Sequence, residues 1–172
     1  MAGLVGSEMC IRDRVKTKIT PLAPILSIDA AIEQESFLEK PLTLSSGQVE
    51  NAYGAAPYQL AGELYAGGQE HFYLEGQAAI AQADENGGIQ LFVSTQHPSE
   101  IQHKVAGMLG LTYGDIPVDV RRMGGGFGGK ESQSNLTACI AALAAHKTGR
   151  PARLVYDRDD DMRVTGKRHD IK

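Results

Sequence analysis

MGGGFGGKE, residues Met123–Glu131, is the stretch that decides how this chain folds, because five of its nine residues are glycine. Val118 and Val120 before it predict a short strand, and the alanine-rich segment after it predicts a helix over residues 131–147. Glycines between a strand and a helix let backbone N–H groups converge and let another group approach the main chain closely. The stretch therefore predicts a strand–loop–helix unit whose loop can cradle an anion or a metal-bound oxygen.

Two phosphate-binding patterns nearly fit the same loop. Gly124, Gly126 and Gly129 satisfy G-x-G-x-x-G, but the next acidic strand end comes later than the roughly 20 positions that the dinucleotide pattern requires. With Lys130 the loop also satisfies G-x-x-x-x-G-K, but Glu131 stands where Ser or Thr would bind magnesium. A glycine-loop nucleotide-binding module therefore remains an alternative, as does a purely structural glycine turn.

The segments before the loop predict strands and a helix. Gln77–Ala83 and Ile89–Thr95 flank the sequence DENGG, which favours a hairpin turn. Pro98 suits the first position of a helix, and Gly110 can close that helix in a left-handed conformation. Strands and helices in this order predict an α/β (α+β) fold with a mixed sheet.

Further elements are predicted outside this region. Gln59–Tyr65 and Pro151–Tyr156 have the pattern of strands, and Pro41–Pro57 is a polar, turn-rich connector. Asp29 is a candidate cap of a short helix. The acidic run Asp157–Asp161 predicts a solvated turn with a salt bridge to a neighbouring arginine.

Composition excludes several classes of protein. The chain has 172 residues, of which 42% are hydrophobic and 22% charged, as in soluble globular domains. Its net charge is −4 and it has no long basic run, which argues against nucleic acid or a membrane surface as partner. No apolar stretch approaches the length that spans a bilayer. Two cysteines are too few for a disulfide scaffold or a Cys-based zinc site, so a cytoplasmic location is the default expectation.

GGQEHFYLE, residues Gly67–Glu75, is the second candidate for chemistry. Gln69 follows two glycines, and its neutral amide can donate one hydrogen bond to an oxo group without adding charge. The alternative is an ordinary capping or turn glutamine. His71 and Glu75 are four residues apart, so they could share a helix face and bind a metal, or simply make a surface contact.

Several long segments resemble the xanthine dehydrogenase and aldehyde oxidase family of molybdenum hydroxylases, in that family's order and spacing. The resemblance runs from about Val15 to the C-terminus. The matching segments are GELYAGGQEHFYLE (Gly62–Glu75), LFVSTQHP (Leu91–Pro98), RMGGGFGGKE (Arg122–Glu131) and GRPARLVYDRDDDMRVTGKRHD (Gly149–Asp170).

The resemblance implies that the chain is a fragment with three parts. Residues 1–14 differ from the rest, and LVGSEMCIRDR within them resembles a translated sequencing-adapter artefact, so they are predicted to be a non-native leader; a genuine disordered leader is the alternative. Residues 15–56 are expected to be the end of a hammerhead-like domain and a connector. Residues 57–172 are expected to be the N-terminal part of a molybdenum-cofactor-binding domain.

The resemblance also assigns roles to single residues. Gln69 matches the glutamine whose side chain hydrogen-bonds an oxygen ligand of molybdenum. Phe127 matches the position whose backbone N–H faces the metal's oxo group, and Gly126 lies beside it. Both Gln69 and Phe127 would therefore act on the metal through its oxygen ligands. Glu131 matches the carboxylate that orients purine substrates, which favours the xanthine-type branch, and Gln96 lies in a segment that resembles a cofactor-side loop.

The implied activity is the oxidative hydroxylation of hypoxanthine or xanthine with water at a molybdenum–molybdopterin cofactor. Electrons would pass to iron–sulfur and FAD centres in other subunits or domains, and the full enzyme is expected to be an oligomer. An aldehyde or N-heterocycle hydroxylase is the alternative within the family. The family's base glutamate, in a Gly-Glu-Pro-like motif, has no counterpart in this sequence. No catalytic residue is therefore assigned here, and the chain alone is expected to be inactive.

Overall fold

The computed structural model describes residue 16 and residues 18–172, so the predicted leader, residues 1–14, lies outside the described residues. The chain divides into two units, Met1–Ala61 and Gly62–Lys172. All the strands and all the buried core side chains of the described part belong to the second unit. The predicted domain limits at residues 56 and 57 stay a prediction.

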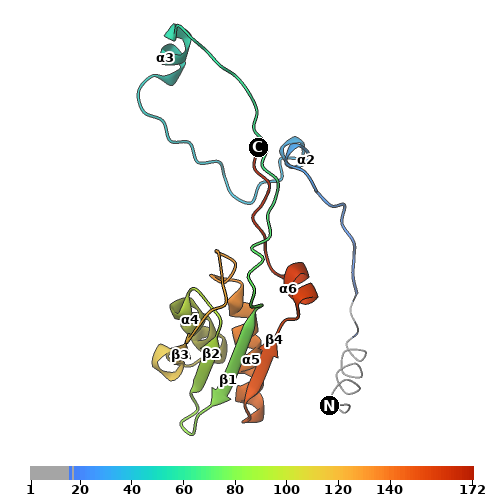
Figure 1. Cartoon of the computed structure of the whole chain (residues 1–172), viewed down its shortest axis with the longest axis vertical. Helices are drawn as coiled ribbons and strands as arrows, with labels where there is room; N and C mark the ends of the chain where they lie inside the picture. The colour runs from blue at the N-terminus through green and yellow to red at the C-terminus, as the bar shows by residue number, and fades with distance from the viewer. Residues whose placement is uncertain (1–15, 17) are drawn as a thin grey trace. The chain divides into compact units, whose positions relative to one another are not determined.

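The predicted hairpin forms the middle of the sheet in the second unit (Figure 1). Strand β1 is Ala78–Ala83 and strand β2 is Ile89–Val93, and the two pair antiparallel. Asp84 fixes the turn between them, because its carboxylate accepts hydrogen bonds from two backbone N–H groups of the turn, each at 2.8 Å. The hairpin prediction is therefore confirmed.

Two further strands complete a four-stranded sheet of order β3-β2-β1-β4. Strand β3, Val118–Asp119, runs parallel to β2, and strand β4, Ala152–Val155, runs antiparallel to β1. Helix α4, Pro98–Leu109, connects β2 to β3, and helix α5, Ser134–Thr148, connects β3 to β4. A short 3-10 helix, η1 (Tyr113–Asp115), precedes β3. The mixed α/β class predicted from the sequence is confirmed.

Helices α4 and α5 lie behind the sheet in Figure 1, and the core fills the space between them and the strands. Small side chains on α5 let the helix approach the strands closely. As predicted, α4 ends at Gly110, whose φ is 70°. Helix α5 ends in the same way at Gly149, whose φ is 63°. The buried apolar side chains are Ala79, Ala81, Ile89, Leu91, Val93, Ile101, Val105, Ala106, Ile116, Ala138, Ala141, Ala142 and Ala145.

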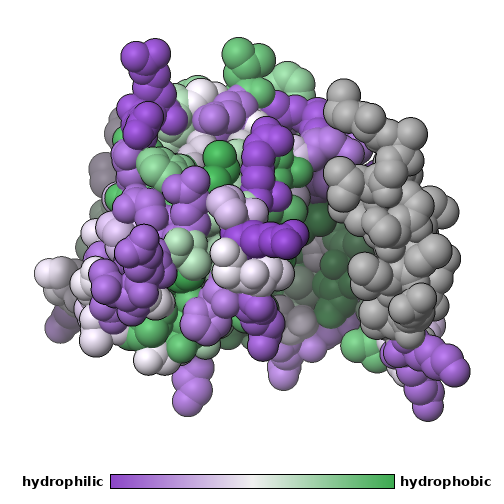
Figure 2. Space-filling view, turned by 90° about the horizontal axis from the view of Figure 1, so that it is seen from below, coloured by the Kyte–Doolittle hydropathy of each residue, from purple (hydrophilic) through white to green (hydrophobic). Residues whose placement is uncertain are grey.

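Hydrophilic residues dominate the face of the molecule drawn in Figure 2, and hydrophobic residues show between them. Such a mixture is normal for a protein surface, because polar atoms alone cannot cover a globule. None of the helices in the described part of the chain is both long enough and apolar enough to cross a membrane.

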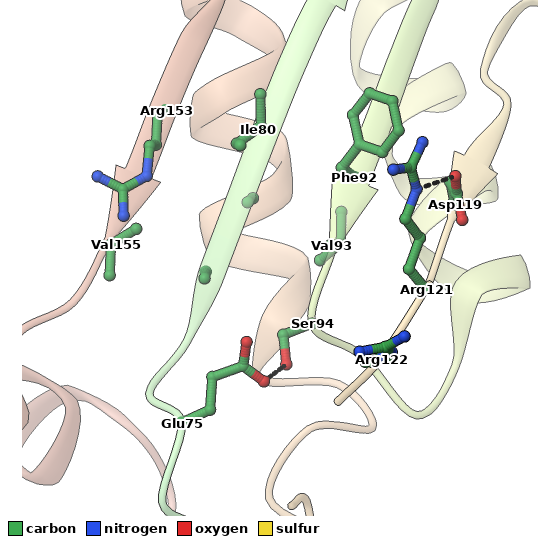
Figure 3. Close-up of a pocket in the computed structure, with 12 residues that line it drawn as sticks. Glu75, Ile80, Phe92, Val93, Ser94, Asp119, Arg121, Arg122, Arg153 and Val155 are labelled. Carbon is green, nitrogen blue, oxygen red and sulfur yellow. Dashed lines mark hydrogen bonds and ion pairs between the residues drawn. The ribbon is translucent and has the colours of Figure 1, made fainter. Parts of the chain in front are cut away.

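The second face of the sheet carries a shallow hollow of about 260 Å³ (Figure 3). Ile80 of β1 lies between Phe92 of β2 and Arg153 of β4 in the strand register. The guanidinium of Arg121 lies 5.4 Å from the centre of the Phe92 ring and pairs with Asp119 at 3.3 Å. This face therefore combines apolar side chains with arginines, unlike the apolar face beneath α4 and α5.

The predicted strand Gln59–Tyr65 is wrong. These residues form no strand, and the nearest backbone pairing is a single bridge between Ala66 and Ile171. A short apolar pattern does not specify a strand unless another segment supplies hydrogen-bond partners along its length.

Two short helices lie before the sheet. Helix α2 is Ile28–Glu33, and its cap is Ser27, whose hydroxyl accepts a hydrogen bond at 3.2 Å from a first-turn N–H. The prediction of Asp29 as the cap is therefore wrong, and Asp29 lies in the first turn, where a negative charge suits the helix dipole. Helix α3, Val49–Ala55, lies within the segment predicted as the connector Pro41–Pro57.

Two other predictions need correction near the C-terminus. Helix α5 begins at Ser134, three residues later than predicted, which leaves Glu131 in the loop before it.

The acidic run predicted as a solvated turn forms helix α6, Arg158–Val164. Asp157 caps this helix by accepting the N–H of the third helical residue at 2.8 Å, and Asp161 is buried at 1% exposure. A carboxylate cap followed by further carboxylates suits a helix N-terminus.

Candidate functional site

The glycine loop, residues 123–130, runs from the end of β3 towards α5 and has an unusual backbone. The φ angle is +96° at Gly125 and +52° at Phe127, but it is not positive at Gly126 between them. A left-handed conformation costs a residue with a side chain about 1–3 kcal/mol, so it persists only where the surroundings impose it. Phe127 is therefore held in this conformation by the rest of the loop.

Three consecutive N–H groups of the loop, those of Gly125, Gly126 and Phe127, have no hydrogen-bond partner among the described residues. Successive N–H groups in a backbone whose φ angles alternate in sign converge into a concave nest that binds anions and oxygen ligands. We call Gly125–Phe127 the loop nest. These three unpaired donors are the candidates for binding a ligand at the loop.

Gln69 and Phe127 lie on the same hollow, which has a volume of about 640 Å³. The backbone N–H of Gln69 donates to the carbonyl of Arg168 at 3.0 Å, and the backbone N–H of Arg168 donates to the carbonyl of Gln69 at 3.1 Å. The side-chain amide of Gln69 has no partner within the described residues, so it can donate to a ligand. The hollow is lined by Gln69, Glu70, His71, Phe127, Lys167 and Arg168.

Gln96 holds the loop from the end of β2. Its side-chain oxygen Oε1 accepts hydrogen bonds from the N–H groups of Gly128, at 3.0 Å, and Lys130, at 3.2 Å. A Cβ atom at Gly126 would lie 2.6 Å from this oxygen. Position 126 must therefore be glycine because of Gln96, whether or not a ligand binds the loop.

Lys130, at the end of the loop, is completely buried. Its ammonium group donates to the Ser94 hydroxyl at 2.7 Å, pairs with Glu75 at 3.3 Å and lies 4.7 Å from the centre of the Tyr73 ring. Burial lowers the pKa of Lys130, and the Glu75 carboxylate offsets only part of this effect. A lysine that points into the protein is not placed to reach a phosphate, so the geometry does not support the G-x-x-x-x-G-K interpretation.

Glu75 joins the loop to the two central strands. One carboxylate oxygen accepts hydrogen bonds at 2.7 Å from the N–H of Gly124 and from the hydroxyl of Ser94 (Figure 3). Burial acts to raise the pKa of Glu75, but these hydrogen bonds and the charge of Lys130 outweigh it, so the pKa lies below its ordinary value. The sequence did not indicate this pair, because Glu75 and Lys130 are distant along the chain.

The metal site considered for His71 and Glu75 is not formed. Residues 67–75 are not helical, so the two side chains do not share a helix face. Glu75 is engaged with Ser94, while His71 lines the hollow beside Gln69. The described part of the chain contains no cluster of three or more His, Cys, Asp or Glu side chains that could hold a metal ion.

A second buried network connects α6 to the loop. Asp161 accepts hydrogen bonds from the Tyr73 hydroxyl at 2.7 Å and from the N–H of Gln77 at 2.9 Å. The side chain of Gln77 in turn donates to the carbonyl of Gly129 at 2.9 Å. Burial, together with the Asp161 carboxylate, raises the pKa of Tyr73 to about 12. The carboxylate of Asp161 therefore contributes to the position of the glycine loop, a role that the sequence did not indicate.

Glu131 is exposed and is not among the residues that line the hollow of Gln69 and Phe127. Glu131 does not stabilise α5 as a first-turn acidic residue, because the first turn of that helix contains no acidic residue. Glu131 therefore does not share this hollow with Gln69 and Phe127, and Gly126 is not among its lining residues either.

The unpaired donors of Gln69 and of the loop nest fit a cofactor whose metal carries oxygen ligands. The loop nest supplies three backbone N–H groups, and Gln69 supplies one neutral amide, all without a hydrogen-bond partner in the described part of the chain. Neutral donors of this kind can bind oxygen ligands without introducing a competing charge.

Comparison with known proteins extends this result. Residues 32–172 match the family described as molybdopterin cofactor-binding domain. The xanthine dehydrogenase/oxidase of Rattus norvegicus is 47% identical over 90% of this chain. Aldehyde oxidase 1 of the same species is 43% identical over 90% of the chain. The chain spans only 12% of the length of each of these relatives.

Solved structures have the same fold. Quinoline 2-oxidoreductase from Pseudomonas putida 86 matches 83% of this chain and 19% of its own, with a TM-score of 0.65 and 24% identity. Aldehyde oxidoreductase from Desulfovibrio gigas matches 72% of this chain and 14% of its own, with a TM-score of 0.64 and 25% identity. The resemblance to the xanthine dehydrogenase and aldehyde oxidase family is confirmed, and the chain belongs to the molybdopterin cofactor-binding domain family.

Proposed function

We propose that this chain is part of the molybdopterin-binding subunit of a xanthine dehydrogenase, which hydroxylates hypoxanthine and xanthine with water. The observation that carries the proposal is that Gln69, with its unpaired amide, and Phe127 of the loop nest line the same hollow. The identity of 47% to a xanthine dehydrogenase/oxidase supports the choice of branch.

The chain's own residues would bind and orient the cofactor. Gln69 donates one hydrogen bond, and the N–H of Phe127 donates another from a fixed loop. Gly126 lies beside Phe127, and its missing side chain leaves room for Gln96. Donors that are already in position stabilise developing negative charge without reorganising during the reaction. The molybdenum cofactor, when bound, supplies the redox chemistry.

The remaining parts of the proposed enzyme lie outside this chain. Iron–sulfur clusters and FAD in other subunits or domains would accept the electrons, and the complete enzyme would be a cytoplasmic oligomer. The general base would also come from outside, since no catalytic residue is assigned within the chain. Glu131 is proposed to bind the purine once the complete protein surrounds it.

The primary test is the cofactor content of the complete protein that contains this chain. The purified protein should contain molybdenum and pterin in nearly equal amounts. Titration with ATP and NAD serves as the comparison, because a nucleotide-binding module would bind one of these instead. Binding of ATP or NAD at the glycine loop, with no molybdenum or pterin, would refute the proposal.

The substrate class is tested by Glu131→Gln in the complete enzyme. If the Glu131 carboxylate orients the purine, kcat/KM for hypoxanthine should fall by roughly 10- to 100-fold, or about 1.4–2.8 kcal/mol of transition-state stabilisation. Simple aldehydes lack the polar edge of the purine and should be affected much less. Glu85→Gln, at the exposed hairpin turn, is the matched control. Equal losses for both substrates would overturn the proposed role of Glu131 in purine specificity.

A further inference from the structure

We propose that the second face of the sheet is a docking surface for an acidic segment of the same polypeptide, from a part of the complete protein beyond these 172 residues. The segment carries apolar side chains in its middle and carboxylates towards both ends. We call this surface the arginine face, and its residues are Ala78, Ile80, Phe92, Asp119, Arg121, Arg122, Arg153 and Val155. The inference does not rest on the proposed function, because none of these residues is assigned to the cofactor or the substrate.

A row of side chains crosses the arginine face from one edge strand to the other. In the strand register, Ile80 of β1 lies opposite both Phe92 of β2 and Arg153 of β4. Phe92 in turn lies opposite Asp119 of β3. Figure 3 shows the two apolar side chains in the middle, with Arg153 on one side and Arg121 on the other. The face therefore has an apolar centre flanked by arginines.

Positive charge is in excess on the arginine face. Arg122 and Arg153 are exposed, and neither has a hydrogen bond or an ion pair among the described residues. The carboxylate of Asp119 is already paired with Arg121, and that of Glu75, at the border of the face, belongs to the buried ion pair described above. Two guanidinium groups are thus left over, and their planar donors match the two oxygens of a carboxylate. Charge complementarity therefore points to an acidic partner.

The apolar centre of the face is bare. Ile80 is 37% and Val155 41% exposed, whereas helices α4 and α5 cover the opposite face of the sheet (Figure 1). The guanidinium of Arg121 lies over the ring of Phe92, but only its Nε pairs with Asp119. Sheets in folded domains are normally covered by a second layer that buries their apolar side chains. The partner must therefore supply apolar side chains as well as carboxylates.

The size of the face argues for a segment of the same polypeptide. Neighbouring strands lie about 4.8 Å apart and rise about 3.3 Å per residue, so four strands with a longest strand of six residues give a face of roughly 14 by 20 Å, about 300 Å². Separate proteins that associate stably bury about 800 Å² on each partner.

A covalently connected segment does not need such a large surface, because the connection gives it a high effective concentration. Its source is available in the complete protein, since the chain spans only 12% of the length of its xanthine dehydrogenase/oxidase relative. The same width of about 14 Å, three strand spacings, sets the distance between the two groups of carboxylates on the segment.

The first experiment is zero-length cross-linking of the complete protein with a carbodiimide, which joins an amine to a carboxylate in direct contact. Arg153→Lys and Arg122→Lys keep the positive charge and introduce the amine that the reaction needs. Arg150→Lys is the matched control, because Arg150 is exposed close to β4 but does not line the arginine face. Digestion and mass spectrometry identify the joined peptides.

The amines at positions 153 and 122 should each be joined to an Asp or Glu of one segment outside residues 1–172. The control amine should not be joined to that segment. Mixed assemblies of isotope-labelled and unlabelled chains distinguish links within one polypeptide from links between copies. Links only to a second copy, to a separate subunit or to residues within 1–172 would overturn the inference, as would the absence of any link from either position.

The second experiment measures the exposure of Phe92 in the complete protein by hydroxyl-radical labelling. Phe92 should be protected in the wild type, and labelling should increase severalfold in Arg153→Glu, because the reversed charge repels the segment. Changing the cross-linked carboxylate to arginine in the same protein should restore protection. Arg150→Glu should label like the wild type. If Arg153→Glu does not fold, Arg153→Gln replaces it, because it removes the charge without reversing it.

Readily labelled Phe92 in the wild type would show that the arginine face is open in the complete protein and would overturn the inference. Unchanged labelling in a folded Arg153→Glu or Arg153→Gln variant would overturn it equally. These measurements are independent of the cofactor, so a protein without pterin would refute the proposed function and leave the docking surface to be judged by its cross-links.

Discussion

Gln69 places one neutral amide at the hollow that Phe127 also lines. In the complete, molybdenum-replete enzyme, Gln69→Ala should lower kcat more than it raises KM, because the amide is proposed to contact the cofactor and not the substrate. Loss of this contact should cost about 1–3 kcal/mol if an oxygen ligand is left unpaired. Steady-state kinetics provide the measurement, with Gln82→Ala as a control. A large rise in KM at unchanged kcat would contradict this role.

Glu75 provides a prediction that depends on pH. Its pKa is lowered in the folded protein, so its contribution to stability is present above the ordinary value of 4.5 and is lost as the pH falls through the lower folded value. At pH 7, Glu75→Gln should lower the free energy of unfolding by about 1–3 kcal/mol, because Lys130 loses a charged partner. The difference from wild type, measured by denaturant unfolding, should shrink towards zero below pH 4.5.

The exposed Glu85 is the control for this experiment. Glu85→Gln should leave the free energy of unfolding almost unchanged at every pH. If the difference in the free energy of unfolding between wild type and Glu75→Gln stays constant as the pH falls, the charge of Glu75 does not stabilise the loop.

At the scale of elements, helix α6 offers a matched pair of carboxylates. Asp161 is buried and accepts hydrogen bonds from Tyr73 and Gln77, whereas Asp160 is exposed in the same helix. Asp161→Asn should destabilise the protein by about 1.5–3 kcal/mol, since hydrogen bonds to a charged group are lost. Asp160→Asn should have little effect. Thermal and denaturant unfolding measure both, and equal changes would contradict the proposed contribution of α6 to the loop.

Elements with signals at both ends could be predicted from the sequence. Helix α4 has proline at its start and left-handed Gly110 at its end, and the turn between β1 and β2 carries a hairpin sequence. Helix α6 was missed, although Asp157 followed by further acidic residues is a local signal for a helix N-terminus. The burial of Asp161 against Tyr73 could not be predicted, because it joins residues that are distant along the chain.

At the scale of the whole molecule, the four-stranded sheet has two open edges within the described residues. Strands β3 and β4 form its two edges, and its second face carries exposed Ile80 and Val155. Open edges and exposed apolar side chains favour association with other chains. The isolated 172-residue chain is therefore expected to be poorly stable or to aggregate. Cooperative thermal unfolding of a monomer would argue against this expectation.

The isolated chain is also expected to have no hydroxylase activity. It contains no assigned base, and its sequence has no iron–sulfur or flavin motif to carry electrons away. The measurement is hypoxanthine oxidation by the purified chain supplied with an artificial electron acceptor, with the complete enzyme as the positive control. Steady turnover by the chain alone would contradict the prediction.

The sequence by itself determined the family, the mixed α/β class and the identity of the glycine loop, because these depend on local patterns and on motifs in a fixed order. It also indicated Gln69 and Phe127, and both lie on one hollow. Only the tertiary structure decided that Lys130 points into the protein and that Gln96 holds the loop. These features depend on contacts between residues that are distant along the chain, where the burial and orientation of each side chain are set by its partner.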